Sequence, residues 1–290
     1  MGEKSKILII GATGYLGKFI TGTSVKLGHE TFALIRETTA SNNPDKSKLI
    51  DHFTDSGVKL VYGDIYNHES LVDAIKQVDV VISAVSDEEV ADQRFIPSEF
   101  VADVDRMEAV YPATSRFEEK AKIRRMIETE EIPYTYVVCY NFAGSFLPAF
   151  AQSFDGKEPP RDKVIIFGDG NTKEDIATYT MKAVDDPRTL NKILYMRPPA
   201  NILSFHDLVS MWESKIGKLL GRTYISEDEL LKGIQDAPMP RKLNLAIAHC
   251  TLVKGANFDF ETDTSSGVEA SQLYPEVTYT TVDEYLNQFV

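Results

Sequence analysis

Short apolar segments alternate with amphipathic ones along the first 140 or so residues. The apolar segments are rich in β-branched residues, which is typical of buried strands, and they cover residues 6–10, 31–35, 58–62, 78–83, 94–96 and 134–138. Helical spacing of apolar side chains between them predicts helices that reach Gly28 or cover residues 70–77 and 113–130. Apolar strands that alternate with helices predict a parallel sheet covered on both faces.

The pattern changes beyond about residue 150, where turn residues flank a short predicted strand at 164–167. Three later helices start with a capping box, in which Ser or Thr precedes an acidic residue by three positions: Ser204 with Asp207, Ser226 with Glu229, and Thr281 with Glu284. We therefore expect an α/β protein with a Rossmann, doubly wound parallel sheet over residues 1–150. A smaller α+β substrate-binding lobe follows over residues 151–290; this boundary is approximate, and the chain can cross between the lobes.

The connection between the strands at 78–83 and 94–96 is short. A parallel crossover usually needs a dozen or more residues, normally with a helix. Residues 85–93 are too few and too polar for that. We expect an irregular link here and no full crossover helix, either because the crossover is abbreviated or because a segment is absent from the numbered chain.

Charge and composition exclude several classes of protein. The net charge of −13 argues against a nucleic-acid partner, which needs clustered Lys and Arg. No apolar run approaches the roughly 20 residues of a membrane span, and no secretory signal opens the chain, so we expect a cytoplasmic monomer or homodimer. The two cysteines, Cys139 and Cys250, are expected to be reduced, buried and inert. Cysteine and histidine never occur at the spacing of zinc ligands, so we expect no metal site.

A glycine-rich segment directly follows the first strand and opens a helix. Its spacing, glycine at every third position, lets backbone amides approach a pyrophosphate. The alternative is an ordinary glycine-containing turn. The residues predicted to bind the cofactor here are Gly11, Ala12, Thr13, Gly14, Tyr15, Leu16 and Gly17.

The end of the second strand indicates which dinucleotide binds. An acidic residue there would accept the ribose 2′-OH of NAD, whereas Arg accommodates a 2′-phosphate. Arg36 occupies this position, and Lys46 and Lys48 follow in what reads as a polar loop. A surface arginine is often only a solvated charge, but this placement favours NADPH over NADH.

Lys120 is the candidate general base. Short-chain dehydrogenases place a tyrosine four residues before the lysine, and here that position is Arg116. Arg124 lies four residues further on, hence on the same helical face, and a neighbouring cation would favour the neutral, proton-accepting lysine. The alternative is a solvated helix face with a Glu118–Lys122 pair.

Several motifs together resemble the plant isoflavone reductase-like family, whose members are NmrA-like atypical short-chain dehydrogenases. They are Gly-Ala-Thr-Gly-Tyr-Leu-Gly at 11–17, Pro-Ser-Glu-Phe at 97–100, Asp-Val-Asp-Arg at 103–106, Phe-Glu-Glu-Lys-Ala-Lys-Ile-Arg-Arg at 117–125 and Tyr-Thr-Thr-Val-Asp-Glu-Tyr at 279–285. The family includes phenylcoumaran benzylic ether, pinoresinol–lariciresinol and isoflavone reductases. The resemblance covers essentially the whole chain and is strongest to phenylcoumaran benzylic ether reductases.

The resemblance implies roles for individual residues. It makes Lys120 the catalytic base, Arg124 an NADP-binding residue, and Arg36 and Lys46 the ligands of the 2′-phosphate. Asn141 and Phe142, which leave the end of the strand at 134–138, join the cofactor-binding residues. Tyr140 and His249 are the fallback proton acceptors.

Two features depart from the family pattern. Val101 and Ala102 stand where the family carries a glycine after Ser-Glu-Phe. About fourteen family residues are missing between residues 93 and 94, and about six near residues 173–174.

The implied function is NADP(H)-dependent hydride delivery to a small phenolic substrate of plant phenylpropanoid metabolism, a benzylic ether or a related lignan or isoflavonoid. Lys120 would take the phenolic proton. The alternatives are an isoflavone or alkaloid-pathway reductase of the same family, and a non-catalytic NADP-binding sensor.

Overall fold

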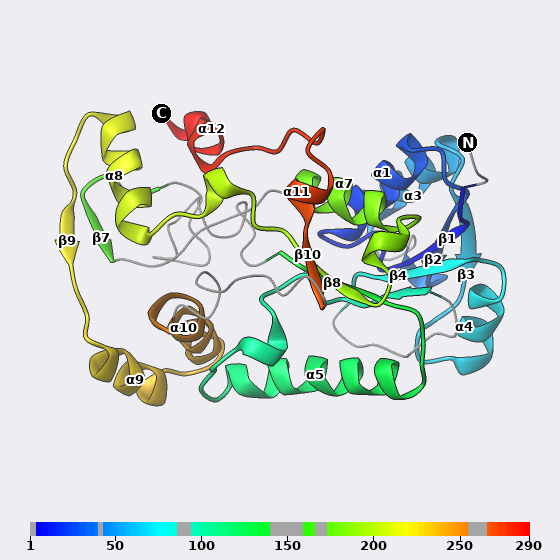
Figure 1. Cartoon of the computed structure of the whole chain (residues 1–290), viewed down its shortest axis with the longest axis horizontal. Coiled ribbons are helices and arrows are strands. Elements are labelled where there is room, and N and C mark those ends of the chain that lie inside the picture. The colour runs from blue at the N-terminus through cyan, green and yellow to red at the C-terminus, as the bar shows by residue number, and fades with distance from the viewer. Residues whose placement is uncertain (1–3, 40–42, 86–93, 140–158, 166–172, 255–265) are drawn as a thin grey trace.

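A computed structural model describes residues 4–39, 43–85, 94–139, 159–165, 173–254 and 266–290 (Figure 1). A five-stranded sheet, entirely parallel, has the strand order β3-β2-β1-β4-β5. Its strands are β1 (Ile7–Ile10), β2 (Thr31–Ile35), β3 (Lys59–Tyr62), β4 (Val80–Ser83) and β5 (Arg94–Ile96). This topology confirms the predicted Rossmann-type α/β fold.

Three more parallel strands continue from β5. A bridge between Phe95 and Tyr134 leads to a sheet of order β10-β8-β6, formed by β6 (Thr135–Val138), β8 (Lys192–Tyr195) and β10 (Gly267–Glu269). Two of these strands come from the second half of the chain. The chain therefore crosses back from its second half to pair with a strand of its first half.

Helices cover both faces of the five-stranded sheet (Figure 1). Ile7 and Ile9 face a layer made by α1 (Gly17–Lys26), α3 (Pro44–Asp55) and α7 (Lys173–Ala183). Leu8 and Ile10 face the opposite layer, made by α4 (His68–Ile75) and α5 (Ala113–Thr129). This alternation follows from the two-residue period of a strand, and it explains why the strands are apolar throughout.

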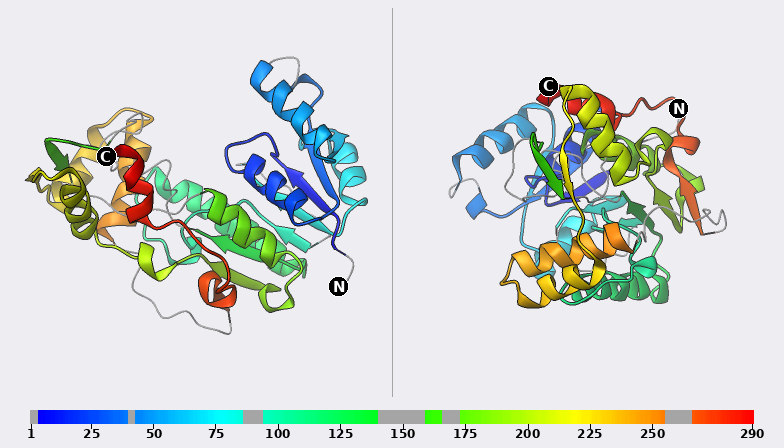
Figure 2. Two further views of the ribbon diagram at one scale, coloured as in Figure 1. Left: turned by 90° about the horizontal axis from the view of Figure 1, so that it is seen from above. Right: turned by 90° about the vertical axis from the view of Figure 1, so that its left-hand side faces the viewer.

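The second lobe lies at the far end of α5, away from the five-stranded sheet (Figures 1 and 2). It contains α8 (Phe205–Ile216), α9 (Glu227–Asp236), α10 (Arg241–Ala248), α12 (Val282–Leu286) and the parallel pair β7 (Lys163–Ile165) and β9 (Gly221–Thr223). All three predicted capping boxes are present, at the starts of α8, α9 and α12. The core of the lobe gathers around Trp212 and includes Ala113 of α5.

Short elements complete the description: 3-10 turns at Val104–Arg106, Pro187–Thr189, Pro199–Asn201 and Asn287–Phe289, a π-helical turn at His249–Val253, and α11 (Ala270–Leu273). Among the described residues, no helix is both long and apolar enough to cross a membrane.

The predicted polar loop after Arg36 is wrong in part, because its second half is the helix α3. Asn43 caps this helix by accepting hydrogen bonds from the amides of Asp45 and Lys46, and Pro44 occupies its first turn. Helices α7 and α10 and strands β8 and β10 were also not predicted. The link between β4 and β5 spans residues 84–93, and all of it after residue 85 lies outside the described residues.

Candidate functional site

The glycine-rich segment forms a tight turn from β1 into α1. Gly11 has a φ of +82°, a left-handed conformation that favours glycine, and its carbonyl accepts the amide of Gly14 at 2.8 Å. A Cβ on Gly11 would lie 2.9 Å from the carbonyl oxygen of Ala84, and a Cβ on Gly17 would overlap the carbonyl of Gly11. The turn therefore packs backbone against backbone, with no room for side chains at these two positions.

The start of α1 suits an anion. Its cap position, Leu16, offers no side-chain hydrogen bond, and its first turn holds no acidic residue. Unpaired amides and the helix dipole both favour negative charge at such an end. Because Gly11 and Gly17 carry no side chain, the turn closes directly onto the start of α1, a geometry that fits the pyrophosphate of a dinucleotide.

The seven predicted residues of this segment differ in their surroundings. Gly11 and Thr13 line a cavity of about 230 Å³. Ala12 and Leu16 are buried in the core beneath the turn, so only their backbone could reach a ligand. Tyr15 is about half exposed.

The same cavity brings together the two cations predicted to bind a 2′-phosphate. Arg36 is exposed directly after β2 and forms no ion pair with any described residue, whereas Lys46 is half-buried in the first turn of α3. Lys48 does not line the cavity. The lining residues are Ile10, Gly11, Thr13, Leu34, Ile35, Arg36, Thr39, Lys46, Gly63, Asp64, Ile65, Tyr66 and Val85.

Lys120 lies at the same edge of the sheet as the glycine turn. It is half-buried on α5, and its Nζ donates a hydrogen bond to the carbonyl oxygen of Ser98, two residues after β5. Only β4 separates β5 from β1, and neighbouring strands are about 4.8 Å apart, which places the ends of β1 and β5 roughly 10 Å from each other. Ligands of doubly wound sheets bind at this carboxyl edge, where the strand order reverses.

Arg124, expected from the family to bind NADP, has its side chain engaged within the protein. Its side chain has no exposed surface and is bonded to Glu99 at 2.6 Å, to Asp103 at 2.7 Å and to Asp105 at 3.0 Å. Its guanidinium also lies 4.7 Å from the ring centre of Tyr136. Three carboxylates neutralise this arginine, so it does not act on Lys120 as the free cation that helical spacing suggested.

Burial and ion pairing oppose each other in this cluster. Desolvation raises the pKa of the Glu99 carboxyl, and the charge of Arg124 opposes that rise. Desolvation also disfavours the charged form of Arg124, but Glu99 and Asp103 outweigh it and raise the pKa of the guanidinium. Burial likewise raises the pKa of Tyr195, whose hydroxyl donates to Asp103 at 2.8 Å.

The two cysteines are free and buried, as predicted. Burial raises the pKa of the Cys139 thiol, with the charge of Lys120 acting in the opposite direction. A protonated, buried thiol is a poor nucleophile. Cys139 is therefore part of the packing beside Lys120.

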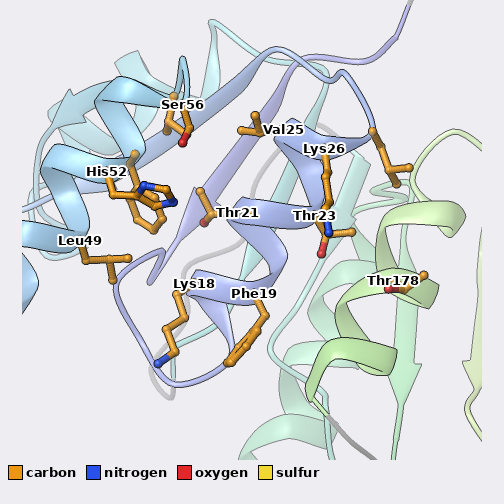
Figure 3. Close-up of a pocket in the computed structure, with 14 residues that line it drawn as sticks. Lys18, Phe19, Thr21, Thr23, Val25, Lys26, Leu49, His52, Ser56 and Thr178 are labelled. Carbon is orange, nitrogen blue, oxygen red and sulfur yellow. The ribbon is translucent and has the colours of Figure 1, made fainter. Parts of the chain in front are cut away.

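A larger cavity lies away from these residues. It has a volume of about 790 Å³ and runs over the outer surface of α1 toward α3 and α7 (Figure 3). Lys18, Leu49 and His52 are among the residues around it. The smaller cavity is the candidate functional site, because it is lined by the glycine turn and by both Arg36 and Lys46.

Other predicted residues fall elsewhere. Asn141, Phe142 and the fallback Tyr140 lie outside the described residues. His249 is buried in the second lobe, with its Nε2 2.9 Å from Glu227. Glu99, Asp103 and Tyr195 were not predicted as parts of the site; the only signal was that two of them lie in the motifs at 97–100 and 103–106.

The chain is similar to known proteins over nearly its whole length. The model of the NmrA-like family matches residues 3–286. The chain is 60% identical to isoflavone reductase homolog A622-like of Nicotiana tabacum, over 99% of each chain. It is 56% identical to phenylcoumaran benzylic ether reductase Pyrc5 of Pyrus communis, over the whole of each chain.

Solved structures show the same likeness. A crystal structure of isoflavone reductase superimposes with a TM-score of 0.93 at 46% identity, covering 99% of this chain and all of the other. The binary complex of leucoanthocyanidin reductase with NADPH from Vitis vinifera gives 0.86 at 33% identity, covering 98% and 99%.

The chain is shorter than the first of these relatives. Their alignment runs over 308 positions, against 290 residues here, so at least 18 positions of the relative have no counterpart in this chain. This agrees with the expectation that segments of the family pattern are absent.

Proposed function

Because the chain belongs to the NmrA-like family, we propose that it is an NADPH-dependent reductase of phenylpropanoid-derived phenols that uses Lys120 as its general base. The proposal rests on one observation: the candidate cofactor-binding residues and Lys120 lie at the same edge of the sheet. The glycine turn and the cation pair of Arg36 and Lys46 suit NADPH, and Lys120 reaches the same edge through Ser98. The relatives named as reductases support the reaction class.

The residues divide the work of binding the cofactor. The backbone of the turn at 11–17 and the start of α1 would hold the pyrophosphate, and Arg36 and Lys46 would hold the 2′-phosphate. Bound NADPH supplies the hydride that reduces the benzylic carbon. The substrate class we propose is a phenol that carries a benzylic ether para to its hydroxyl.

Lys120 would start the reaction on the substrate. A neutral amine at Nζ accepts the phenolic proton. Electrons of the phenolate then form the quinone methide as the para benzylic C–O bond breaks, and the ether oxygen leaves with the bonding pair and takes up a proton. That species is electrophilic at the benzylic carbon, the position that hydride must reach. Its capture by water would end the reaction unproductively, so the site must exclude water.

Replacement of Lys120 tests the proposal. NADPH oxidation should be followed with a phenylcoumaran, a furofuran lignan, an isoflavone and a coniferyl ester. Lys120→Ala removes the proton acceptor but leaves the glycine turn and Arg36, so turnover should fall about 10²–10⁴-fold while NADPH affinity changes little. Lys120→Arg should not restore activity, because a guanidinium stays protonated.

Exposed Lys122, two residues along α5, supplies the matched control. Lys122→Ala should keep wild-type turnover. If Lys120→Ala kept more than about a third of it, Lys120 would lose its role as general base. NADPH binding without turnover of any of the four compounds would instead favour a sensor.

A further inference from the structure

Two side chains of α5 hold the same short segment that follows β5. Lys120 Nζ donates to the carbonyl oxygen of Ser98, and Arg124 Nη2 donates to Oε2 of Glu99 at 2.6 Å. Residues four apart lie on one helix face, so a single turn of α5 separates the two contacts. The peptide that accepts the bond from Lys120 therefore joins directly to the residue that is anchored by Arg124.

This segment is fixed from several directions. The side chain of Glu99 is 2% exposed, and the amide of Glu99 donates to the carbonyl of Pro97 at 2.7 Å. Phe100 is buried with a φ of +28°, a left-handed conformation that a non-glycine residue keeps only where its surroundings hold it. On the far side, the amide of Cys139 donates to the carbonyl of Val101 at 3.1 Å.

The carbonyl of Ser98 determines how Lys120 can present its lone pair. A neutral amine has two N–H donors and one lone pair. When a carbonyl accepts one N–H, the lone pair must point away from that carbonyl. A shift of the Ser98 peptide would therefore turn the lone pair of Lys120.

We propose that Glu99 is a positioning residue for the general base. Its ion pair with Arg124 fixes the Ser98 carbonyl, and that carbonyl aims Nζ of Lys120. With 2% of its side chain exposed, Glu99 acts through Ser98 and not by touching the substrate. The inference rests on the proposed role of Lys120.

Two substitutions at Glu99 test it. Glu99→Gln removes the charge of the carboxylate, and Glu99→Asp keeps the charge but shortens the reach by one methylene group. Glu99→Asp leaves Arg124 paired with a carboxylate, so the test does not depend on whether Glu99→Gln folds. In both variants kcat should fall about 10- to 100-fold, the effect of a displaced catalytic group, while KM and NADPH affinity stay within about twofold.

Glu213 supplies a matched control in the other lobe. It too is a buried glutamate, and it accepts from Arg222 at 2.7 Å and from the amide of Leu220 at 2.8 Å. Glu213→Gln should lower the melting temperature as Glu99→Gln does, but leave kcat within twofold. An unchanged kcat in folded Glu99→Asp, or an equal loss in Glu213→Gln, would overturn the proposal.

A second measurement does not need turnover. Acylation of Lys120 by acetic anhydride, read by mass spectrometry against exposed Lys122, should speed up in the Glu99 variants and not in Glu213→Gln. If acylation responds in this way but the wild type reduces none of the compounds, the proposed function fails and the positioning role stands. If the wild type is active and neither kcat nor acylation responds to Glu99, only the positioning role fails.

Discussion

Arg36 is the residue at which cofactor choice can be tested most directly. It is exposed, forms no ion pair with the described residues, and shares its cavity with Lys46. A charged hydrogen bond to a 2′-phosphate contributes about 1.5–3 kcal/mol, so Arg36→Ala should weaken NADPH binding about 10- to 150-fold. NADH lacks that phosphate and should bind as before. Titration of both cofactors by fluorescence measures the difference.

Lys48 is the control for Arg36. It lies two residues beyond Lys46 on α3, is exposed, and does not line the cavity. Lys48→Ala should leave both affinities unchanged. Equal losses for NADPH and NADH in Arg36→Ala would remove Arg36 from the 2′-phosphate site.

At the scale of the element, α1 contains two glycines in opposite situations. A Cβ on Gly17 would overlap the backbone of Gly11, whereas a Cβ on Gly22 would meet no atom within 4 Å. Gly17→Ala must displace the turn, so we expect a loss of about 1–3 kcal/mol of stability and weaker NADPH binding. Gly22→Ala should stabilise the protein by about 0.5–1 kcal/mol, because alanine loses less entropy in a helix interior.

Both variants of α1 can be followed by urea unfolding and NADPH titration. Gly22 lies beside the large cavity on the outer side of α1 and not in the cofactor turn, so its substitution should leave NADPH affinity unchanged. Destabilisation by Gly22→Ala, or unaltered binding by Gly17→Ala, would contradict this account of the helix.

At the scale of the whole molecule, the second lobe should be the first part to unfold in acid. Carboxylates that are held there by hydrogen bonds have a lowered pKa: Asp207 and Glu229 through Ser204 and Ser226, Glu213 through Leu220, Glu227 through Lys254, and Glu284 through Thr281. A lowered pKa means that the folded lobe binds fewer protons than the unfolded chain. The stability from these groups is present above their ordinary values, 4.5 for Glu, and is lost as the pH falls through the folded values.

Trp212 makes this acid transition measurable in one lobe. It is the only tryptophan of the chain and is buried in the core of the second lobe. Between about pH 5 and pH 3, tryptophan fluorescence should change before the far-ultraviolet circular dichroism of the whole protein. The Glu229→Gln variant keeps a capping box but cannot titrate, so its melting temperature should fall less over this range. If the melting temperature of Glu229→Gln fell as far as that of the wild type, titration of the capping carboxylates would not be the cause of the acid transition.

What the sequence determined by itself was local. The apolar runs placed β1 to β6 within one or two residues, and Ser204, Ser226 and Thr281 marked the starts of three helices, because caps and strand periods depend on neighbours in the chain. The glycine turn was predictable for the same reason. Its geometry depends on residues 11–17 and on the strand before them.

The tertiary structure decided what depends on distant partners. Helical spacing put Arg124 beside Lys120, but only the fold brings Glu99 and Asp103 to it, from 25 and 21 residues earlier in the chain, and so buries it among carboxylates. The return of β8 and β10 to the first half is equally non-local, because β8 pairs with β6 from more than fifty residues earlier in the chain, and β10 pairs with β8. Ion pairs and strand pairs form between residues that are close in space. The order of residues along the chain does not reveal which of them will meet.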